Sequence, residues 1–174
     1  MIDIQTETVS EILVASVREV FSSMLGSEAT ESEKGDAVVQ RQPYDGVLSF
    51  VGLAGSYVGN GSISCSAITA CDLASRLLMS EAKTVDDEVL DAVGELTNMI
   101  VGSAKNQIED RLGPIQMSIP TSVYGKNISM RSMKTELNVP VRFLYDGGEV
   151  LVSLCLAEAP KNSPRGHMAT LAEV

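Results

Sequence analysis

The sequence predicts an α+β fold in which two long helices pack on one face of a mostly antiparallel sheet. Apolar residues recur with helical spacing in two long stretches, residues 8–25 and 84–111. Strand-like segments form two groups, one between these stretches and one after the second. Helices that stand apart from runs of strands are typical of α+β proteins and not of the strict alternation of α/β proteins.

The composition indicates a folded globule in one domain. The 174 residues are 44% hydrophobic and 21% charged, with a formal charge of -10. This acidic balance, without a basic cluster, argues against binding to nucleic acid or to an anionic membrane. No apolar run approaches the roughly 18 residues that span a membrane. We expect residues 1–159 to form the domain and residues 160–174 to be a flexible tail.

Targeting signals and metal-binding cysteine patterns are not evident. The first residues carry neither a basic region nor a signal-like apolar block. The three cysteines are an odd number without the spacing of metal ligands. We therefore expect a cytoplasmic protein with reduced, buried thiols.

The first half of the chain predicts a helix followed by strands. Apolar positions at helical spacing run from Thr8 to Leu25, and Gly26 is a plausible stop. A strand is expected over 37–39. A hairpin is then expected from strand 46–54 to strand 62–66, punctuated by glycines.

The second half predicts two adjacent helices and further strands. One helix is expected over 68–79, with Thr69 as a possible cap. The next opens at Thr84, carries acidic residues in its first turn, and ends before Gly113. The remaining strands are expected over 115–119, 128–133, 136–145 and 149–157.

The most informative motif lies on the long helix predicted over 84–111. Asp91, Glu95 and Asn98 stand at positions i, i+4 and i+7 and so share one helix face. Gly102 and Lys105 extend this face by two turns. The opposite face carries an apolar stripe suited to burial, made of Val89, Val93, Leu96, Ile100 and Ala104.

Two glycines flank the acid and amide pair at a cost to the helix. Gly94 and Gly102 each destabilise a helix by about 1 kcal/mol relative to alanine. One interpretation is that the backbone of another protein approaches closely here. The alternative is that this is an ordinary solvated face, because most exposed helix faces carry acids and amides without a function.

Several familiar catalytic designs are excluded by the sequence. The only histidine, His167, falls in the predicted tail, so no Ser-His or Cys-His pair can form in the folded part. The sequence has no phosphate-binding Gly-Lys loop, and neither the Cys-x5-Arg nor the Asp-x-Asp motif of two phosphatase designs occurs. The acidic run 86–88 is better explained as a helix start than as a metal site.

An amide remains that can position a water molecule. Asn98 cannot act as a general base, but it can accept and donate hydrogen bonds. Water positioning by an amide assists hydrolysis of a phosphoryl group that is already activated and metal-bound. In such a design Glu95 pairs with a lysine near the target phosphate, and the protein needs no nucleophile of its own.

The runs 91–105 and 119–125 resemble the CheC/CheX/FliY family of chemotaxis phosphatases. Asp91, Glu95 and Asn98 match the family's Asp/Ser-x3-Glu-x2-Asn motif. Its proline corresponds to Pro120, although the family pattern has one residue more than the 21 that separate Asn98 from Pro120 here. The equivalent place in the first helix would hold Ala15, Glu19 and Ser22, which do not match. A single motif makes the chain similar to CheX within this family.

The resemblance implies a fold, a reaction and a partner. It implies a CheX-like domain over residues 1–159 that hydrolyses the aspartyl phosphate of a CheY-like response regulator. By residue, it implies that Asn98 orients the attacking water and that Glu95 docks on the receiver's lysine. The residues implied to bind the partner or support the site are Asp91, Gly94, Gly102, Lys105 and Pro120.

The same resemblance bears on cofactors and assembly. It implies no cofactor of the chain's own, with Mg²⁺ supplied by the receiver, and it implies a homodimer. A non-catalytic receiver-binding or adaptor module of a chemotaxis or other two-component pathway is the alternative function.

Overall fold

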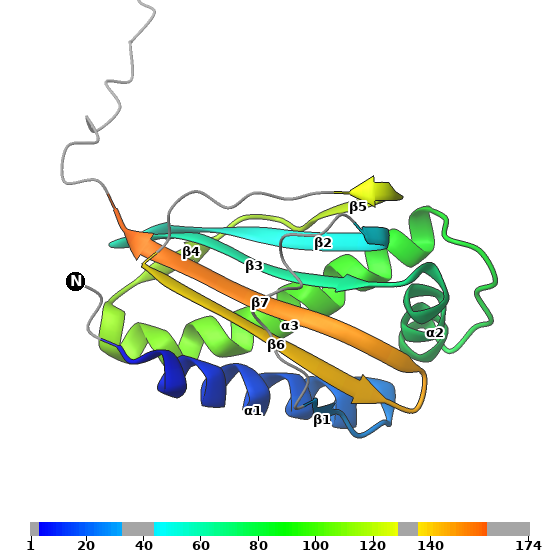
Figure 1. The fold of residues 1–174 in the computed structure, drawn as a ribbon, viewed down its shortest axis with the longest axis horizontal. Helices are drawn as coiled ribbons and strands as arrows, with labels where there is room; N and C mark the ends of the chain where they lie inside the picture. Colours follow the sequence, from blue (N-terminus) through cyan, green and yellow to red (C-terminus); the bar gives the residue numbers. More distant parts are fainter. Residues whose placement is uncertain (1–3, 33–43, 129–135, 160–174) are drawn as a thin grey trace, which may run out of the picture.

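The computed structural model describes residues 4–32, 44–128 and 136–159, and within these ranges it has three helices and a seven-stranded sheet. The helices are α1 (Thr6–Leu25), α2 (Ala67–Leu78) and α3 (Asp87–Leu112). The strands are β1 (Thr30–Glu31), β2 (Tyr44–Gly55), β3 (Tyr57–Cys65), β4 (Ile115–Met117), β5 (Thr121–Ile128), β6 (Leu137–Tyr145) and β7 (Gly148–Glu158). The predicted α+β class is confirmed (Figure 1).

All strand pairings in the described sheet are antiparallel, in the order β1-β6-β7-β3-β2-β4. β5 also pairs with β2. Because β3 occupies one side of β2, β4 and β5 share the other side, where β4 pairs with 53–55 and β5 with 44–50. The two short strands therefore form one edge that is interrupted at residues 118–120.

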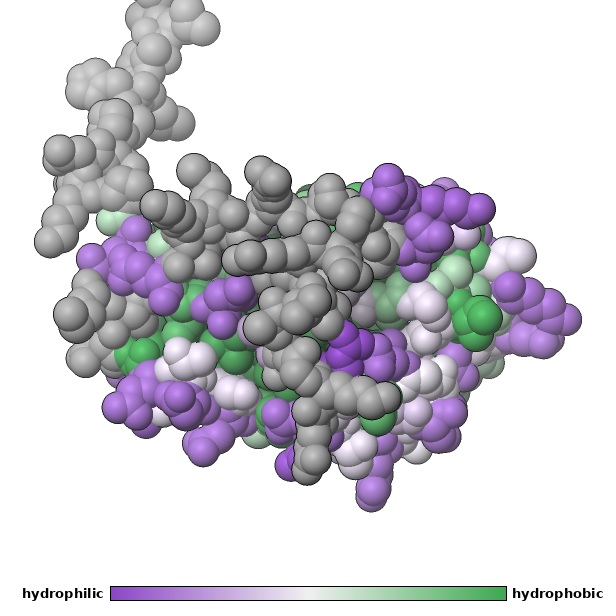
Figure 2. Space-filling model, viewed as in Figure 1, coloured by the Kyte–Doolittle hydropathy of each residue, from purple (hydrophilic) through white to green (hydrophobic). Residues whose placement is uncertain are grey.

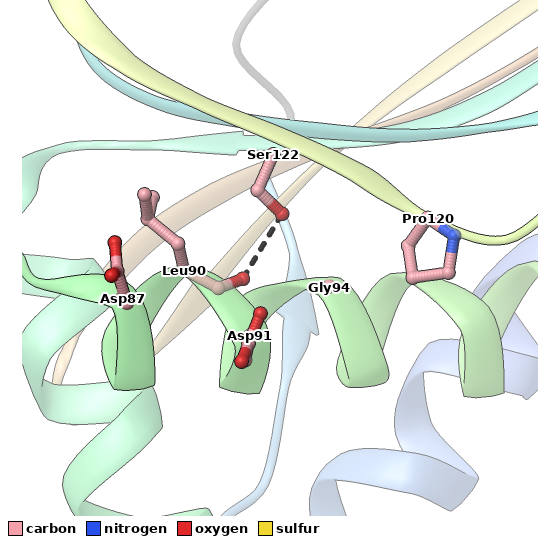
Figure 3. Close-up of a pocket in the computed structure, with 6 residues that line it drawn as sticks. All are labelled: Asp87, Leu90, Asp91, Gly94, Pro120 and Ser122. Carbon is pink, nitrogen blue, oxygen red and sulfur yellow. Dashed lines mark hydrogen bonds between the residues drawn. The ribbon is translucent and has the colours of Figure 1, made fainter.

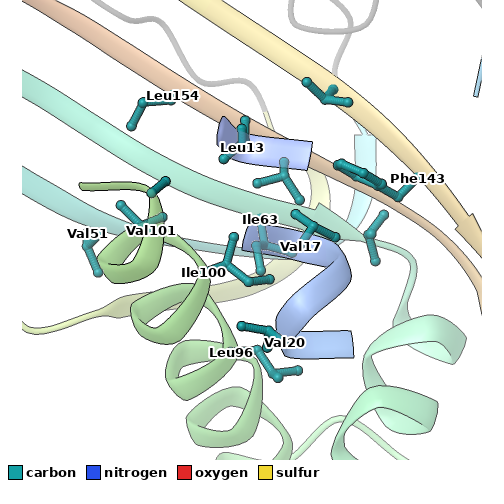
Figure 4. Close-up of a cluster of buried hydrophobic side chains, with 14 of the residues drawn as sticks. Leu13, Val17, Val20, Val51, Ile63, Leu96, Ile100, Val101, Phe143 and Leu154 are labelled. Atoms are coloured by element: carbon teal, nitrogen blue, oxygen red, sulfur yellow. The ribbon is translucent and has the colours of Figure 1, made fainter. Parts of the chain in front are cut away.

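The core lies between this sheet and the helices. The long helices α1 and α3 pack together on one face of the sheet, and α2 lies at one end (Figure 1). Figure 4 shows the centre of the core, where side chains from α1, α3 and the sheet meet. The labelled residues are Leu13, Val17, Val20, Val51, Ile63, Leu96, Ile100, Val101, Phe143 and Leu154. Burying each such side chain contributes about 1.5–3 kcal/mol of transfer free energy.

Hydrophilic side chains gather along the borders of the face that Figure 2 shows. Hydrophilic side chains line the lower border in Figure 2, where α1 lies in Figure 1, and the end near α2. None of the described helices is long and apolar enough to cross a membrane.

The helices follow the sequence pattern closely, and their starts depend on capping side chains. Gly26 ends α1 in the left-handed conformation (φ 60°), as predicted. The α2 cap is Ser66 and not Thr69, because Ser66 Oγ accepts a hydrogen bond from the Thr69 N–H (3.1 Å). Likewise α3 begins at Asp87, because Asp86 Oδ1 accepts from the Val89 N–H (3.0 Å).

One strand of the described sheet was not predicted from the sequence. The strand predicted over 128–133 has only Ile128 within the described residues, and β5 runs from Thr121 to Ile128. Its side chains are exposed or half-buried, so the apolar alternation that marks an inner strand is missing from the sequence. Residues 129–133, the strand predicted over 37–39 and the tail predicted over 160–174 lie outside the described residues.

Candidate functional site

The long helix α3 presents the predicted motif as an exposed face. Asp91 and Glu95 are exposed, and Asn98, one turn further on, is half-buried. The predicted apolar stripe, Val89, Val93, Leu96, Ile100 and Ala104, is at most 1% exposed. Helical periodicity thus identified both faces of α3 correctly.

The motif side chains have no internal partner in the part of the chain that the structure describes. No hydrogen bond or ion pair joins Asp91, Glu95 or Asn98 to another described residue. The adjacent Thr97 behaves differently: it is fully buried and donates to the Val93 carbonyl (2.8 Å). The carboxylates and the amide are therefore solvated and free to bind another molecule.

Pro120 lies beside Gly94 of α3, although 25 residues separate the two in the sequence. From Gly94 to Leu112 the helix advances 18 residues, about 27 Å at its rise per residue. The eight residues from Leu112 to Pro120, which include β4, can span at most about 26 Å, enough to bring Pro120 back to Gly94. The number of residues between Asn98 and Pro120 is therefore the number needed to finish the helix and return along it.

The returning segment explains Gly94. A methyl group on Gly94 would lie 3.5 Å from the Pro120 ring and 3.3 Å from Ser122 Oγ, and Gly94 itself is buried. The close backbone approach inferred from this glycine is therefore made within the molecule, by the start of β5. Packing within the molecule is thus sufficient to explain a glycine at this position, and the role of Gly94 toward a partner remains a prediction.

Gly102 is in a looser environment. A methyl group there would meet the end of the Met117 side chain at 3.8 Å, an ordinary contact distance. It lies two turns beyond Gly94, beside the start of the same returning segment. The structure gives no packing reason for a glycine at this position, and its proposed role toward a partner remains a prediction.

We expect Gly102→Ala to stabilise the protein and Gly94→Ala to do so less. Alanine at 102 gains about 1 kcal/mol of helix propensity, which raises Tm by about 3 °C for a domain of this size. At 94 the same gain is offset by the approach to Ser122 and Pro120. Thermal unfolding of the two variants checks this, and an equal gain at both sites would show that β5 does not constrain Gly94.

A pocket opens between the first turns of α3 and the start of β5 (Figure 3). Its volume is about 370 Å³, and its lining comprises Asp87, Leu90, Asp91, Gly94, Pro120 and Ser122. Ser122 Oγ donates to the Leu90 carbonyl (3.0 Å) and is hydrogen-bonded with Ser49 Oγ (3.1 Å). These bonds fix β5 against the helix and keep the pocket wall in place.

Lys105 is engaged at the far end of the helix. Its Nζ donates to the Ile115 carbonyl (3.1 Å) and forms an ion pair with Glu109 (2.8 Å). Glu109 in turn accepts a hydrogen bond from the Ile115 N–H (2.7 Å). Lys105 therefore fixes β4 to α3, and its roles in supporting the site and in binding a partner stay predictions.

This arrangement lowers the pKa of Glu109 below 4.5, chiefly through the Lys105 hydrogen bond and then through the Ile115 N–H. Because the folded-state pKa is the lower one, the carboxylate stabilises the fold above that ordinary value. The stabilisation is lost as the pH falls through the folded-state pKa.

We accordingly expect Glu109→Gln to unfold at a lower temperature than the wild type at neutral pH. The difference should shrink as the pH falls below about 4. Thermal unfolding across this range measures it. A difference that does not change with pH would show that the ionised carboxylate is not what stabilises this contact.

The described residues offer neither a metal cluster nor a reactive thiol. No group of three or more His, Cys, Asp or Glu side chains among them is placed to hold a metal ion. Cys65, Cys71 and Cys155 are buried and form no disulfide bond with one another. Burial raises the pKa of the Cys65 thiol to about 12, which disfavours the nucleophilic thiolate.

The first helix lies beside α3 but lacks the motif. Ala15, Glu19 and Ser22 are exposed on α1. Ser103 of α3 donates a hydrogen bond to Glu19 (3.3 Å). The site is therefore built on α3 alone, with a carboxylate and an amide one turn apart. Such a pair can bind a cation and a water molecule at the surface of another protein.

A family model and a curated relative, both described as CheX, match this chain. The family model described as "Chemotaxis phosphatase CheX" matches residues 47–144. A Thermotoga maritima protein named "CheY-P phosphatase CheX" is 27% identical over 130 residues, covering 74% of this chain and 83% of that protein.

Solved structures agree in fold. The CheX-CheY-BeF3-Mg+2 complex from Borrelia burgdorferi matches with a TM-score of 0.73 at 26% identity, covering 85% of this chain and 97% of that one. The chemotaxis protein CheX from Desulfovibrio desulfuricans matches with a TM-score of 0.75 at 22% identity, covering 86% and 99%.

Proposed function

This chain belongs to the CheX family of chemotaxis phosphatases, and on this basis we propose that it hydrolyses the aspartyl phosphate of a CheY-like receiver domain. The observation that carries the proposal is a pair of side chains on α3, the exposed Glu95 and the half-buried Asn98. Glu95 and Asn98 lie one turn apart and have no partner among the described residues. Two relatives support it by their names, one as a CheY-P phosphatase and one as a complex with CheY.

In the proposed reaction, Asn98 orients the water that attacks the phosphorus atom. Its amide can accept a hydrogen bond from this water and donate one to a phosphoryl oxygen. The water oxygen forms the new bond to phosphorus while the bond from phosphorus to the aspartyl oxygen breaks. The products are orthophosphate and the free carboxylate, and the proton lost by the water passes to solvent or phosphate.

Glu95 acts as a docking residue in this proposal. Its carboxylate pairs with the lysine of the receiver's active site, which places Asn98 next to the phosphoryl group. The Mg²⁺ that neutralises the phosphoryl charge belongs to the receiver. Asp91, beside the pocket, and Pro120, against Gly94, position the helix face and its neighbouring segment.

The test is orthophosphate release from a phosphorylated CheY-like receiver in the presence of Mg²⁺. We expect release to be faster with the protein than by self-hydrolysis of the receiver. Binding is measured in parallel with the receiver held in its active form by beryllofluoride. Binding without acceleration would contradict the enzymatic proposal and favour the non-catalytic receiver-binding module.

A further inference from the structure

We propose that Ile119 is a receiver-docking residue, contributing apolar contact area beside the catalytic pair without taking part in the chemical step. This inference rests on the proposed function, and it names a residue outside the Asp-Glu-Asn motif. Ile119 lies in the interruption between β4 and β5, at residues 118–120. Its side chain is 85% exposed.

The backbone around Ile119 is held firmly. Ser118 pairs with both backbone groups of Gly52, since its N–H donates to the Gly52 carbonyl (2.9 Å) and its Oγ accepts from the Gly52 N–H (2.8 Å). The Ser118 hydroxyl donates to the carbonyl of Ile119 (2.8 Å). The interruption of the edge is therefore an ordered feature fixed to β2.

Two properties of the sequence restrict Ile119 further. A residue before proline is confined to extended conformations, and Pro120 follows directly. A β-branched side chain also has few χ1 rotamers. An exposed isoleucine with so little freedom loses little entropy when a partner covers it, which favours its use in binding.

The position of this segment places Ile119 next to the motif. The Met117 side chain lies where a methyl group on Gly102 would meet it, and the Pro120 ring lies where a methyl group on Gly94 would meet it. Ile119 therefore lies between two points that are eight residues apart on α3, and Asn98 is midway between those points. A receiver that reaches Asn98 comes close to this segment as well.

The internal structure gives Ile119 no other role. An isoleucine that is 85% exposed contributes little to the core, and single exposed apolar residues are common. Ile68 of α2 is such a residue: it is 82% exposed and lies outside the 117–120 segment. It therefore serves as a matched control for Ile119.

The experiment compares Ile119→Ala, Ile119→Leu and Ile68→Ala in steady-state hydrolysis of a phosphorylated CheY-like receiver. We expect Ile119→Ala to raise KM about tenfold with kcat unchanged, since contact area lost equally from the ground and transition states affects binding alone. Ile119→Leu should stay close to the wild type. Ile68→Ala should leave both constants unchanged, and all three variants should keep the wild-type Tm.

The outcomes separate this inference from the proposed function. Wild-type activity with an unchanged KM in Ile119→Ala would overturn the docking role alone. An equal rise in KM for Ile68→Ala would overturn it as well, because the effect would then follow general surface hydrophobicity. A wild type that neither binds nor dephosphorylates the receiver would overturn the proposed function and the inference with it.

Discussion

Replacing Asn98 by alanine is expected to lower the protein's acceleration of orthophosphate release from the phosphorylated receiver by about two orders of magnitude. This is the usual loss when one preorganised hydrogen-bonding group that acts in a transition state is removed. Affinity for the receiver should change little, because the amide is proposed to act on water and not on the docking surface.

The variant should fold normally. Asn98 is half-buried and has no hydrogen-bond partner among the described residues, so its truncation breaks no hydrogen bond to them. Alanine is also the better helix former. Asn98→Asp is the matched variant of nearly equal shape: it keeps an acceptor, loses the donor and adds a charge facing the phosphate. Unchanged phosphate release in Asn98→Ala would show that the catalytic assignment is wrong, even if binding persists.

Reversing the charge of Glu95 is expected to weaken receiver binding about 100-fold. A lysine at this position would face the receiver's lysine, which replaces an attraction by a repulsion at an interface that excludes water. Glu95→Gln should have an intermediate effect and a weaker dependence of affinity on salt concentration. Titration of the beryllofluoride-activated receiver with each variant measures both quantities.

Asp110→Lys provides the control for net charge. Asp110 is exposed on the same helix, and it lies 15 residues from Glu95, about 22 Å along the axis. Both reversals change the net charge by the same amount, so only their positions differ. If the two variants lose affinity equally, the effect comes from overall electrostatics, and the docking role of Glu95 is not supported.

The α3 face that carries the motif could be predicted from the sequence, because it depends only on local periodicity. The positions of Asp91, Glu95 and Asn98 relative to the buried stripe follow from 3.6 residues per turn, and the structure agrees. The start of α3 was predicted at Thr84, whereas the helix begins at Asp87. The hydrogen bond from the Val89 N–H selects Asp86.

The residues that surround this face could not be predicted from the sequence, because they belong to segments that are distant from it along the chain. The edge strand β5 carries no apolar alternation, so it was not predicted from the sequence. Without β5, the close contact at Gly94 could not be assigned to Pro120 and Ser122. The same holds for Lys105, whose exposed face position gave no sign of its contacts with Glu109 and Ile115.

Glu95 and Asn98 have no side-chain partner within 4–32, 44–128 and 136–159, and this has a consequence for selection experiments. Since the fold does not depend on these side chains, a variant that has lost both should accumulate, resist proteases and unfold much like the wild type. Screens that score expression or solubility would therefore not detect the loss of activity. Only a readout in which the receiver's phosphorylation level is visible, such as a reporter under its control, would retain these two residues in a randomised library.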